Sequence, residues 1–221
     1  MTGSPSDDAV TATGLAVTAS VDAQVFLHRL TRLDPAALVR LRPVSAPGPA
    51  RTGLWARLPW QVLVTREVAG AVDGDVTVEA AALLRATDQL PSRQDARWRW
   101  PLPPDSGTVL ETLPAAAVRK VAAAAAATLR QVSQEGLKGR PMGARMVREA
   151  LLDHVPVVVE ADGQRVDVPQ RLVQAVVRMG FLGRTDTPVQ VRCSRRWVGL
   201  AAQFGTAWLP PPSGPLSVRP I

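Results

Sequence analysis

The sequence predicts an α+β protein built from two similar-sized halves. In each half, a helical apolar pattern is followed by three short segments whose apolar residues alternate, as in antiparallel strands. The second half adds a long alanine-rich helix. The shared order makes an internal duplication possible. With 221 residues, 46% hydrophobic and 20% charged, the chain has the composition of an ordinary globular protein.

The first half is predicted to span residues 21–89, after a disordered tail over 1–20. Asp22 is a candidate N-cap, and Pro35 forbids a helix beyond it. The apolar positions between them fall on one helical face: Phe26, Leu27, Leu30 and Leu33. Three strands in a meander follow, over 37–44, 54–59 and 60–68. Thr77 is then expected to cap a helix that runs to about Gln89.

Residues 90–108 form a connector that is rich in proline and charged residues. Such a composition breaks regular structure. We expect this segment to cross the surface and to be held there by the indoles of Trp98 and Trp100.

The second half is predicted over 109–209, before a proline-rich tail over 210–221. A long helix is expected from Pro114 to Glu135, ended by Gly136, and another helix closes near His154. A hairpin follows, turning at 162–163. A helix then starts at Pro169 and stops at Gly180, with Leu172, Val173, Val176 and Val177 facing inward. Three strands over 189–209 complete this half.

The formal charge is +7, and its distribution is uneven. Residues 1–100 carry 11 basic and 10 acidic groups, whereas 101–221 carry 15 and 9. An anionic partner would therefore bind the second half. Nearly all the basic residues are arginines, however, as in any protein from a GC-rich genome, so the charge alone does not identify a nucleic-acid-binding protein.

Several functional classes have no support in the sequence. The N-terminus has no signal-peptide pattern, and no apolar run is long enough to span a membrane. Cys193 is the single cysteine, so no internal disulfide forms, and a cytoplasmic location is expected. His28 and His154 have no ligand-spaced companions for a metal ion. No catalytic or phosphate-loop motif appears, so we expect no cofactor and favour a non-catalytic role, while leaving an enzymatic one open.

The first candidate site is a glycine-rich basic loop that precedes a helix. Free backbone N–H groups at a helix start, together with basic side chains, form an anion pocket. The residues concerned are Lys138, Gly139, Arg140, Gly143 and Arg145. The alternative is a loop whose charges are simply solvated.

The second candidate is a polar stripe on the helix that begins at Pro169. Arg171, Gln174 and Arg178 recur at helical spacing and could read a nucleic-acid groove or contact a partner. The alternative is that these residues are the solvent-facing side of an amphipathic helix.

The third candidate lies in the last strands. Arg192, Arg195 and Arg196 precede Trp197, and arginines beside aromatic rings can hold a single nucleic-acid strand. The alternative, which we favour, is that Trp197 and Trp208 fill the core and the arginines surround a turn. Alternation places Cys193 with Val189 and Val191, which favours an inert buried thiol.

Three stretches carry a family resemblance: LWARLPWQVLVTREVAG, VPQRLVQAVVRMGFLG and RWVGLAAQFGTAWL. Over roughly residues 22–209 the chain resembles a group of uncharacterised proteins of GC-rich actinobacteria. The resemblance implies a cytoplasmic bacterial protein and supplies no site residues.

The sequence therefore favours a protein-interaction or regulatory module, since large aromatic residues and arginines are frequent in protein interfaces. Weak nucleic-acid binding through the second half is the alternative. An enzyme that acts on an anionic small molecule at the loop of Lys138 is the third.

Overall fold

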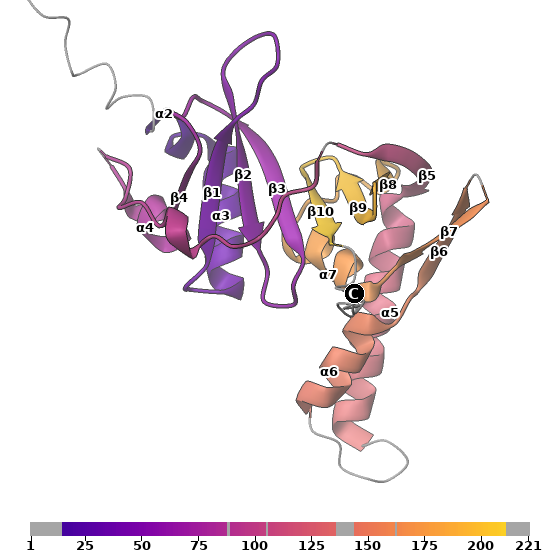
Figure 1. The fold of residues 1–221 in the computed structure, drawn as a ribbon. Coiled ribbons are helices and arrows are strands. Elements are labelled where there is room, and N and C mark those ends of the chain that lie inside the picture. The colour runs from indigo at the N-terminus through magenta and orange to yellow at the C-terminus, as the bar shows by residue number, and fades with distance from the viewer. Residues whose placement is uncertain (1–14, 88, 105, 136–143, 162, 211–221) are drawn as a thin grey trace, which may run out of the picture.

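The structure is a computed structural model that describes residues 15–87, 89–104, 106–135, 144–161 and 163–210. Within these residues the dominant feature is one antiparallel eight-stranded sheet with the order β4-β1-β2-β3-β10-β9-β8-β5 (Figure 1). The first half supplies β1 (Leu38–Pro43), β2 (Arg51–Arg57), β3 (Leu63–Ala69) and β4 (Val76–Glu79). The second half supplies β5 (Thr108–Pro114), β8 (Pro188–Ser194), β9 (Trp197–Ala202) and β10 (Gly205–Leu209).

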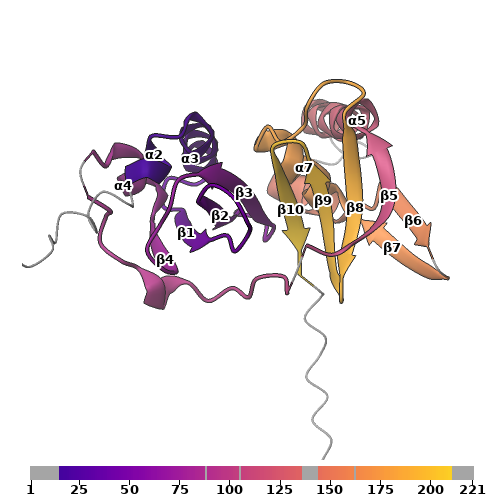
Figure 2. The ribbon, with the colours of Figure 1, turned by 90° about the horizontal axis from the view of Figure 1, so that it is seen from above.

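Helices cover one face of the sheet in both halves (Figure 2). The first half has α2 (Leu15–Thr18), α3 (Val21–Leu33) and α4 (Ala80–Arg85), and the connector holds the short helix η1 (Asp95–Arg97). The second half has α5 (Ala115–Glu135), α6 (Ala144–Asp153) and α7 (Gln170–Arg178). A separate hairpin of β6 (Val157–Ala161) and β7 (Gln164–Val168) projects beside them (Figure 1).

The two halves repeat one plan, which confirms the predicted fold class. In each half an amphipathic helix, α3 or α7, leads into a three-strand meander, and a further strand borders the first strand of that meander. The sheet order is therefore nearly symmetrical about its centre, as an internal duplication would produce. The alanine-rich helix α5 is also present as predicted.

The helix-covered face holds a core that both halves share. Phe26 of α3 and Phe181, just after α7, are fully buried and stack with ring centroids 6.3 Å apart. Stacked rings at this separation add to the stabilisation from apolar burial. The contact links the two helices across the middle of the sheet.

The connector crosses the opposite face of the sheet (Figure 2). Trp197 and Trp208 are buried there, 7% and 3% exposed, around Leu63, and Trp98 of the connector packs against them. The Trp98 indole N–H also donates to the carbonyl of Trp100, 2.7 Å away. The expected anchoring of the connector and the expected core position of the two late tryptophans are therefore both confirmed.

A short seam of strand pairing joins the halves at the centre of the sheet. β10 pairs with β3 through Thr206 and Thr65, Ala207 and Val64, and Trp208 and Leu63. Gly205 opens β10 with a φ of 155°, and a Cβ there would lie 2.6 Å from the carbonyl oxygen of Thr65. Only glycine allows this close approach of the two backbones.

Three local predictions were wrong or incomplete. Thr77 does not cap a helix: it lies in β4, and the helix begins only at Ala80. Asp22 is not the N-cap, which is Ser20; instead its carboxylate pairs with buried Arg66 at 2.5 Å. The strand β5 was not predicted at all. The hairpin predicted before α7, in contrast, is confirmed, because β6 and β7 pair antiparallel.

Candidate binding surfaces

The predicted anion-binding loop lies largely outside the described residues. Lys138, Gly139, Arg140 and Gly143 belong to the range 136–143, which is not described. Arg145 lies in α6, but its side chain is not described either. Anion binding at this loop stays a prediction.

Arg171, one of the three residues of the predicted stripe on α7, contacts protein neighbours. Its guanidinium donates to the carbonyl of Trp60 at 3.3 Å and pairs with Asp153 of α6. The indole of Trp60 donates in return to the carbonyl of Arg171 at 3.1 Å. Arg171 therefore joins α6, α7 and the turn between β2 and β3. Gln174, half-buried, and Arg178, exposed, lie on the side of α7 that the prediction assigned to a partner.

Arg192 is also occupied by neighbouring groups. Its guanidinium donates to the side-chain oxygen of Gln190 at 3.0 and 2.6 Å and to the carbonyl of Ser106 at 3.1 Å. These bonds fix β8 to the segment that leads into β5. Arg192 lines a different hollow of the surface from Arg195 and Arg196, the other two members of its predicted cluster.

Arg195 and Arg196 line a second feature, an open cleft of about 1120 Å³ that we call the basic cleft. It is bordered by the turn between β8 and β9, the connector, β7 and the start of α7. Five arginines and two aspartates line it: Arg99, Arg165, Arg171, Arg195 and Arg196, with Asp153 and Asp167. The structure thus brings three predicted arginines together and adds two that sequence reasoning missed.

The charges of the basic cleft are only partly neutralised. Arg165 pairs with Asp167 at 3.0 Å, and Arg171 pairs with Asp153. Among the described residues, no carboxylate pairs with Arg99, Arg195 or Arg196, and all three are exposed. The cleft therefore presents three unneutralised guanidinium groups to a ligand.

Cys193 and Trp100 also line the basic cleft. Cys193 is half-buried and not fully buried as expected, and its thiol donates to the carbonyl of Arg195, 3.1 Å away. The Trp100 ring is held from one side by Arg57, whose guanidinium carbon lies 3.7 Å from the ring centroid. Burial there lowers the pKa of Arg57 from its ordinary value.

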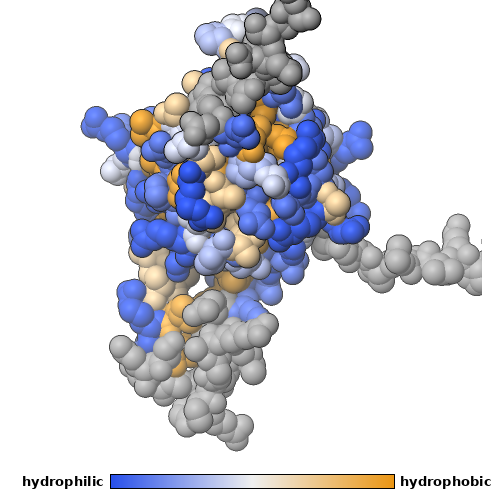
Figure 3. All heavy atoms as spheres, turned by 90° about the vertical axis from the view of Figure 1, so that its left-hand side faces the viewer, coloured by the Kyte–Doolittle hydropathy of each residue, from blue (hydrophilic) through white to orange (hydrophobic). Residues whose placement is uncertain are grey.

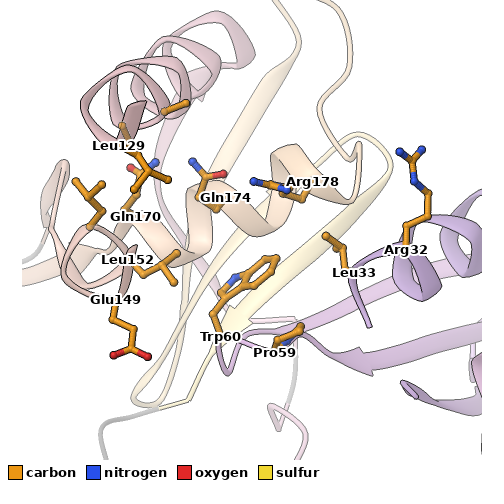
Figure 4. A pocket seen from close by; sticks show the side chains of 13 residues that line it. Arg32, Leu33, Pro59, Trp60, Leu129, Glu149, Leu152, Gln170, Gln174 and Arg178 are labelled. Carbon is orange, nitrogen blue, oxygen red and sulfur yellow. The ribbon is translucent and has the colours of Figure 1, made fainter. Parts of the chain in front are cut away.

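The third feature is a groove of about 660 Å³ between the halves, which we call the inter-half groove (Figure 4). The first half contributes the end of α3 and the turn between β2 and β3, and the second half contributes α5, α6 and α7. Its larger apolar side chains are Leu33, Trp60, Leu129, Leu151 and Leu152. All five are only partly buried, so they keep apolar surface that the protein itself does not cover.

Gln170 is the unusual residue of this groove. It is 1% exposed, and among the described residues neither its side-chain nitrogen nor its side-chain oxygen has a hydrogen-bond partner. Its own backbone N–H donates to the carbonyl of His154 at 2.8 Å, so the residue is held in place at the start of α7. In Figure 4 its amide lies between α7 and Leu129 of α5. Buried amides without a protein partner are rare in native proteins, so this amide marks a candidate position for a bound polar group.

Arginines border the opposite end of the groove. Arg32 closes α3 in the first half and Arg178 closes α7 in the second, on the two sides of Leu33 (Figure 4). Both are exposed, and within the described residues neither forms an ion pair. Gln174 lies between this end and Gln170, one turn along α7.

Sequence reasoning missed the groove because its lining comes from five separate segments. One signal was present: Gln170 shares a helical face with Val173 and Val177, so a polar residue stood on the apolar side of a predicted helix.

The outer face of the first half differs from the apolar lining of the inter-half groove. Figure 3 shows mainly hydrophilic residues there, with small apolar areas between them.

Within the described ranges, no group of three or more His, Cys, Asp or Glu side chains could hold a metal ion. The helices described in the structure include none that is both long and apolar enough to cross a membrane.

Several solved structures are similar to the chain. A DNA polymerase sliding clamp from Pseudomonas aeruginosa aligns with a TM-score of 0.49 and 12% identity, over 86% of this chain and 62% of that one. The beta subunit of DNA polymerase from Streptococcus pyogenes gives 0.48 and 10%, over 86% and 63%. The DNA polymerase III beta subunit from Thermotoga maritima gives 0.47 and 11%, over 90% and 63%. The chain thus spans less than two thirds of the length of these structures.

No curated protein matches the chain. Two family models do match it, and their ranges meet inside the predicted connector. Residues 10–105 match a domain of unknown function, DUF8010. Residues 102–214, just over half of the chain, match a second domain of unknown function, DUF8185, and the chain therefore belongs to the DUF8185 family.

Proposed function

We propose that this protein is a cytoplasmic, non-catalytic binding module that holds a segment of a partner protein in the inter-half groove. The observation that carries the proposal is the groove's lining. Five large apolar side chains from both halves keep uncovered surface in one concave site. Concave sites with apolar walls and a few placed polar groups are where proteins bind ligands and peptides.

The test is a selection of random heptapeptides on the intact protein, followed by affinity measurement by isothermal titration calorimetry. Leu129→Asp places a charge in the groove, and Ala127→Asp places the same charge on the exposed side of the same helix. We expect selected peptides to bind the wild type and Ala127→Asp equally, and Leu129→Asp at least about tenfold more weakly. If no peptide is selected, or if binding ignores Leu129, the proposal is wrong.

Nucleic-acid binding at the basic cleft is a second candidate. Three guanidinium groups without carboxylate partners, those of Arg99, Arg195 and Arg196, support it, because guanidinium groups bind phosphates through paired hydrogen bonds. The half-buried ring of Trp100 beside them offers a stacking surface for a base.

Fluorescence anisotropy with labelled single-stranded DNA tests this candidate. Three phosphate contacts predict a salt slope of about −2, hence an affinity loss of about twentyfold between roughly 50 and 200 mM salt. Changing Arg99, Arg195 and Arg196 to Gln should abolish binding. A matched control changes three exposed arginines elsewhere to Gln: Arg85, Arg130 and Arg184. Equal losses in both triple variants would show that net charge, and not the cleft, holds the DNA.

A further inference from the structure

We infer that the inter-half groove recognises an extended peptide by three features at once: a backbone N–H and C=O that pair with Gln170, an apolar side chain beside Trp60, and a carboxylate at Arg32 and Arg178. This inference rests on the proposed protein-binding function and names the chemistry of the partner.

The first feature follows from the unpaired amide of Gln170. Its nitrogen is a donor and its oxygen an acceptor, and both are buried without a partner from the part of the chain that the structure describes. A metal ion or a simple anion could satisfy only one of them. One residue of an extended peptide presents an N–H and a C=O along the same edge, which satisfies both. Extended segments carry such unpaired backbone groups into a binding site.

The second feature follows from the walls of the groove. Trp60 from the first half and Leu129 and Leu152 from the second line the same space, and all three are partly exposed (Figure 4). Trp60 is fixed in place, since its indole N–H already donates to the carbonyl of Arg171. Its polar atom is thus occupied and its ring is left for apolar contact, which favours a Leu, Ile or Phe side chain of the peptide.

The third feature follows from charge. Arg32 and Arg178 line the groove from different halves, on the two sides of Leu33, and in the described part of the chain neither has a carboxylate partner. Arg29 lies beside them and donates to the carbonyl of Arg178 at 3.4 Å. Arginines bind carboxylates through paired hydrogen bonds, so an Asp or Glu of the peptide completes this end.

The two end segments of the chain differ in whether they carry the acidic residues that this groove would bind. Residues 211–221 contain no Asp, Glu, Asn or Gln. Residues 1–14 contain Asp7 and Asp8 close to Val10. We infer that the occupant is an acidic segment of a separate partner protein, on the ground of charge complementarity with Arg32 and Arg178. Deletion of residues 1–14 tests the alternative directly: an unchanged peptide affinity supports a partner, and a large gain would assign the groove to the N-terminal segment.

The central experiment is a double-mutant cycle between protein and peptide. The probe is the tightest heptapeptide from the selection above, N-methylated at one backbone position at a time, measured on wild type and on Gln170→Leu. At one position we expect N-methylation to weaken binding about tenfold on the wild type and less than about threefold on Gln170→Leu. If no position shows this difference, Gln170 does not pair with the peptide backbone.

A repeated selection tests the charged end. On the wild type we expect enrichment of Asp and Glu at one position. On the double variant Arg32→Glu, Arg178→Glu we expect Lys and Arg at that position. Unchanged preferences would overturn the inference about the carboxylate.

These outcomes distinguish a failure of the protein-binding function from a failure of the recognition chemistry inferred here. Peptides that depend on Leu129 but ignore Gln170 and the two arginines would leave the protein-binding function standing and overturn only the recognition chemistry. Failure to select any groove-dependent peptide would overturn both. The groove could also hold a second copy of this chain, and sedimentation tests this alternative. If the free protein sediments as a dimer and Leu129→Asp dissociates that dimer, the groove is a self-association site and the inference of a separate partner is wrong.

Discussion

Gln170→Leu should make the free protein more stable. The wild-type side chain buries one amide nitrogen and one amide oxygen that have no partner within the described ranges. Leaving such a group unpaired costs about 1–3 kcal/mol, and leucine removes the polar atoms while keeping a similar side-chain size. For a domain of this size 1 kcal/mol corresponds to about 2–4 °C, so the Tm should rise by roughly 2–10 °C.

Thermal unfolding followed by circular dichroism measures this change. Gln174→Leu is the matched control, because Gln174 lies one turn along the same helix and is half-buried. Its substitution should change stability by less than about 0.5 kcal/mol, as is usual away from special features. A Tm of Gln170→Leu that falls by several degrees would show that the amide already has a partner in the free protein, and the reasoning about the groove would be refuted.

Three further predictions concern the scaffold. Gly199→Ala should destabilise by about 1–3 kcal/mol in urea unfolding, because a Cβ there would lie 2.6 Å from the Trp208 ring. Arg171→Ala should cost about 1–3 kcal/mol in the same assay, since it removes the bonds of the guanidinium to the Trp60 carbonyl and to Asp153. The backbone N–H of Thr77 donates to the carboxylate of Asp95 at 2.7 Å, and this bond lowers the pKa of Asp95. The ionised carboxylate therefore stabilises the fold above about pH 4, and this stabilisation is lost as the pH falls further. Asp95→Asn should therefore be less stable than the wild type at pH 7, with the difference shrinking toward pH 3 in urea titrations; a difference independent of pH would contradict this account.

The repeated plan of a helix and three strands could be predicted because its signals are local. The apolar face of α3, ending before Pro35, and the alternation through β2 and β3 each extend over a whole element. Long periodic segments of this kind constrain the chain by themselves.

The two outer strands could not be predicted in the same way. β4 is four residues long and runs directly into α4, so its alternation is too short to distinguish it from a helix start. β5 is mostly exposed and has a bulge between Val109 and Glu111. Both form because β1 and β8 offer them an open edge, which is a tertiary effect.

The candidate sites show a similar limit. Periodicity correctly placed Gln174 and Arg178 on one side of α7, but it does not reveal which neighbour covers that side. The docking of α6 and of the turn after β2 turned Arg171 into a structural residue. The same docking created the groove around Gln170, which no single segment of sequence encodes.

The central seam also has a consequence for how the chain is made. Among the described strands β10 comes last in the chain, yet it is the strand that covers the edge of β3 in the middle of the sheet. During synthesis the edge of β3 therefore stays unpaired while more than about a hundred further residues are added. Open edges are where nascent chains pair with the wrong strand, and a β10 donated by another chain would fit this edge equally well. We expect refolding at high concentration to yield dimers with exchanged second halves, and dilute refolding to yield monomers.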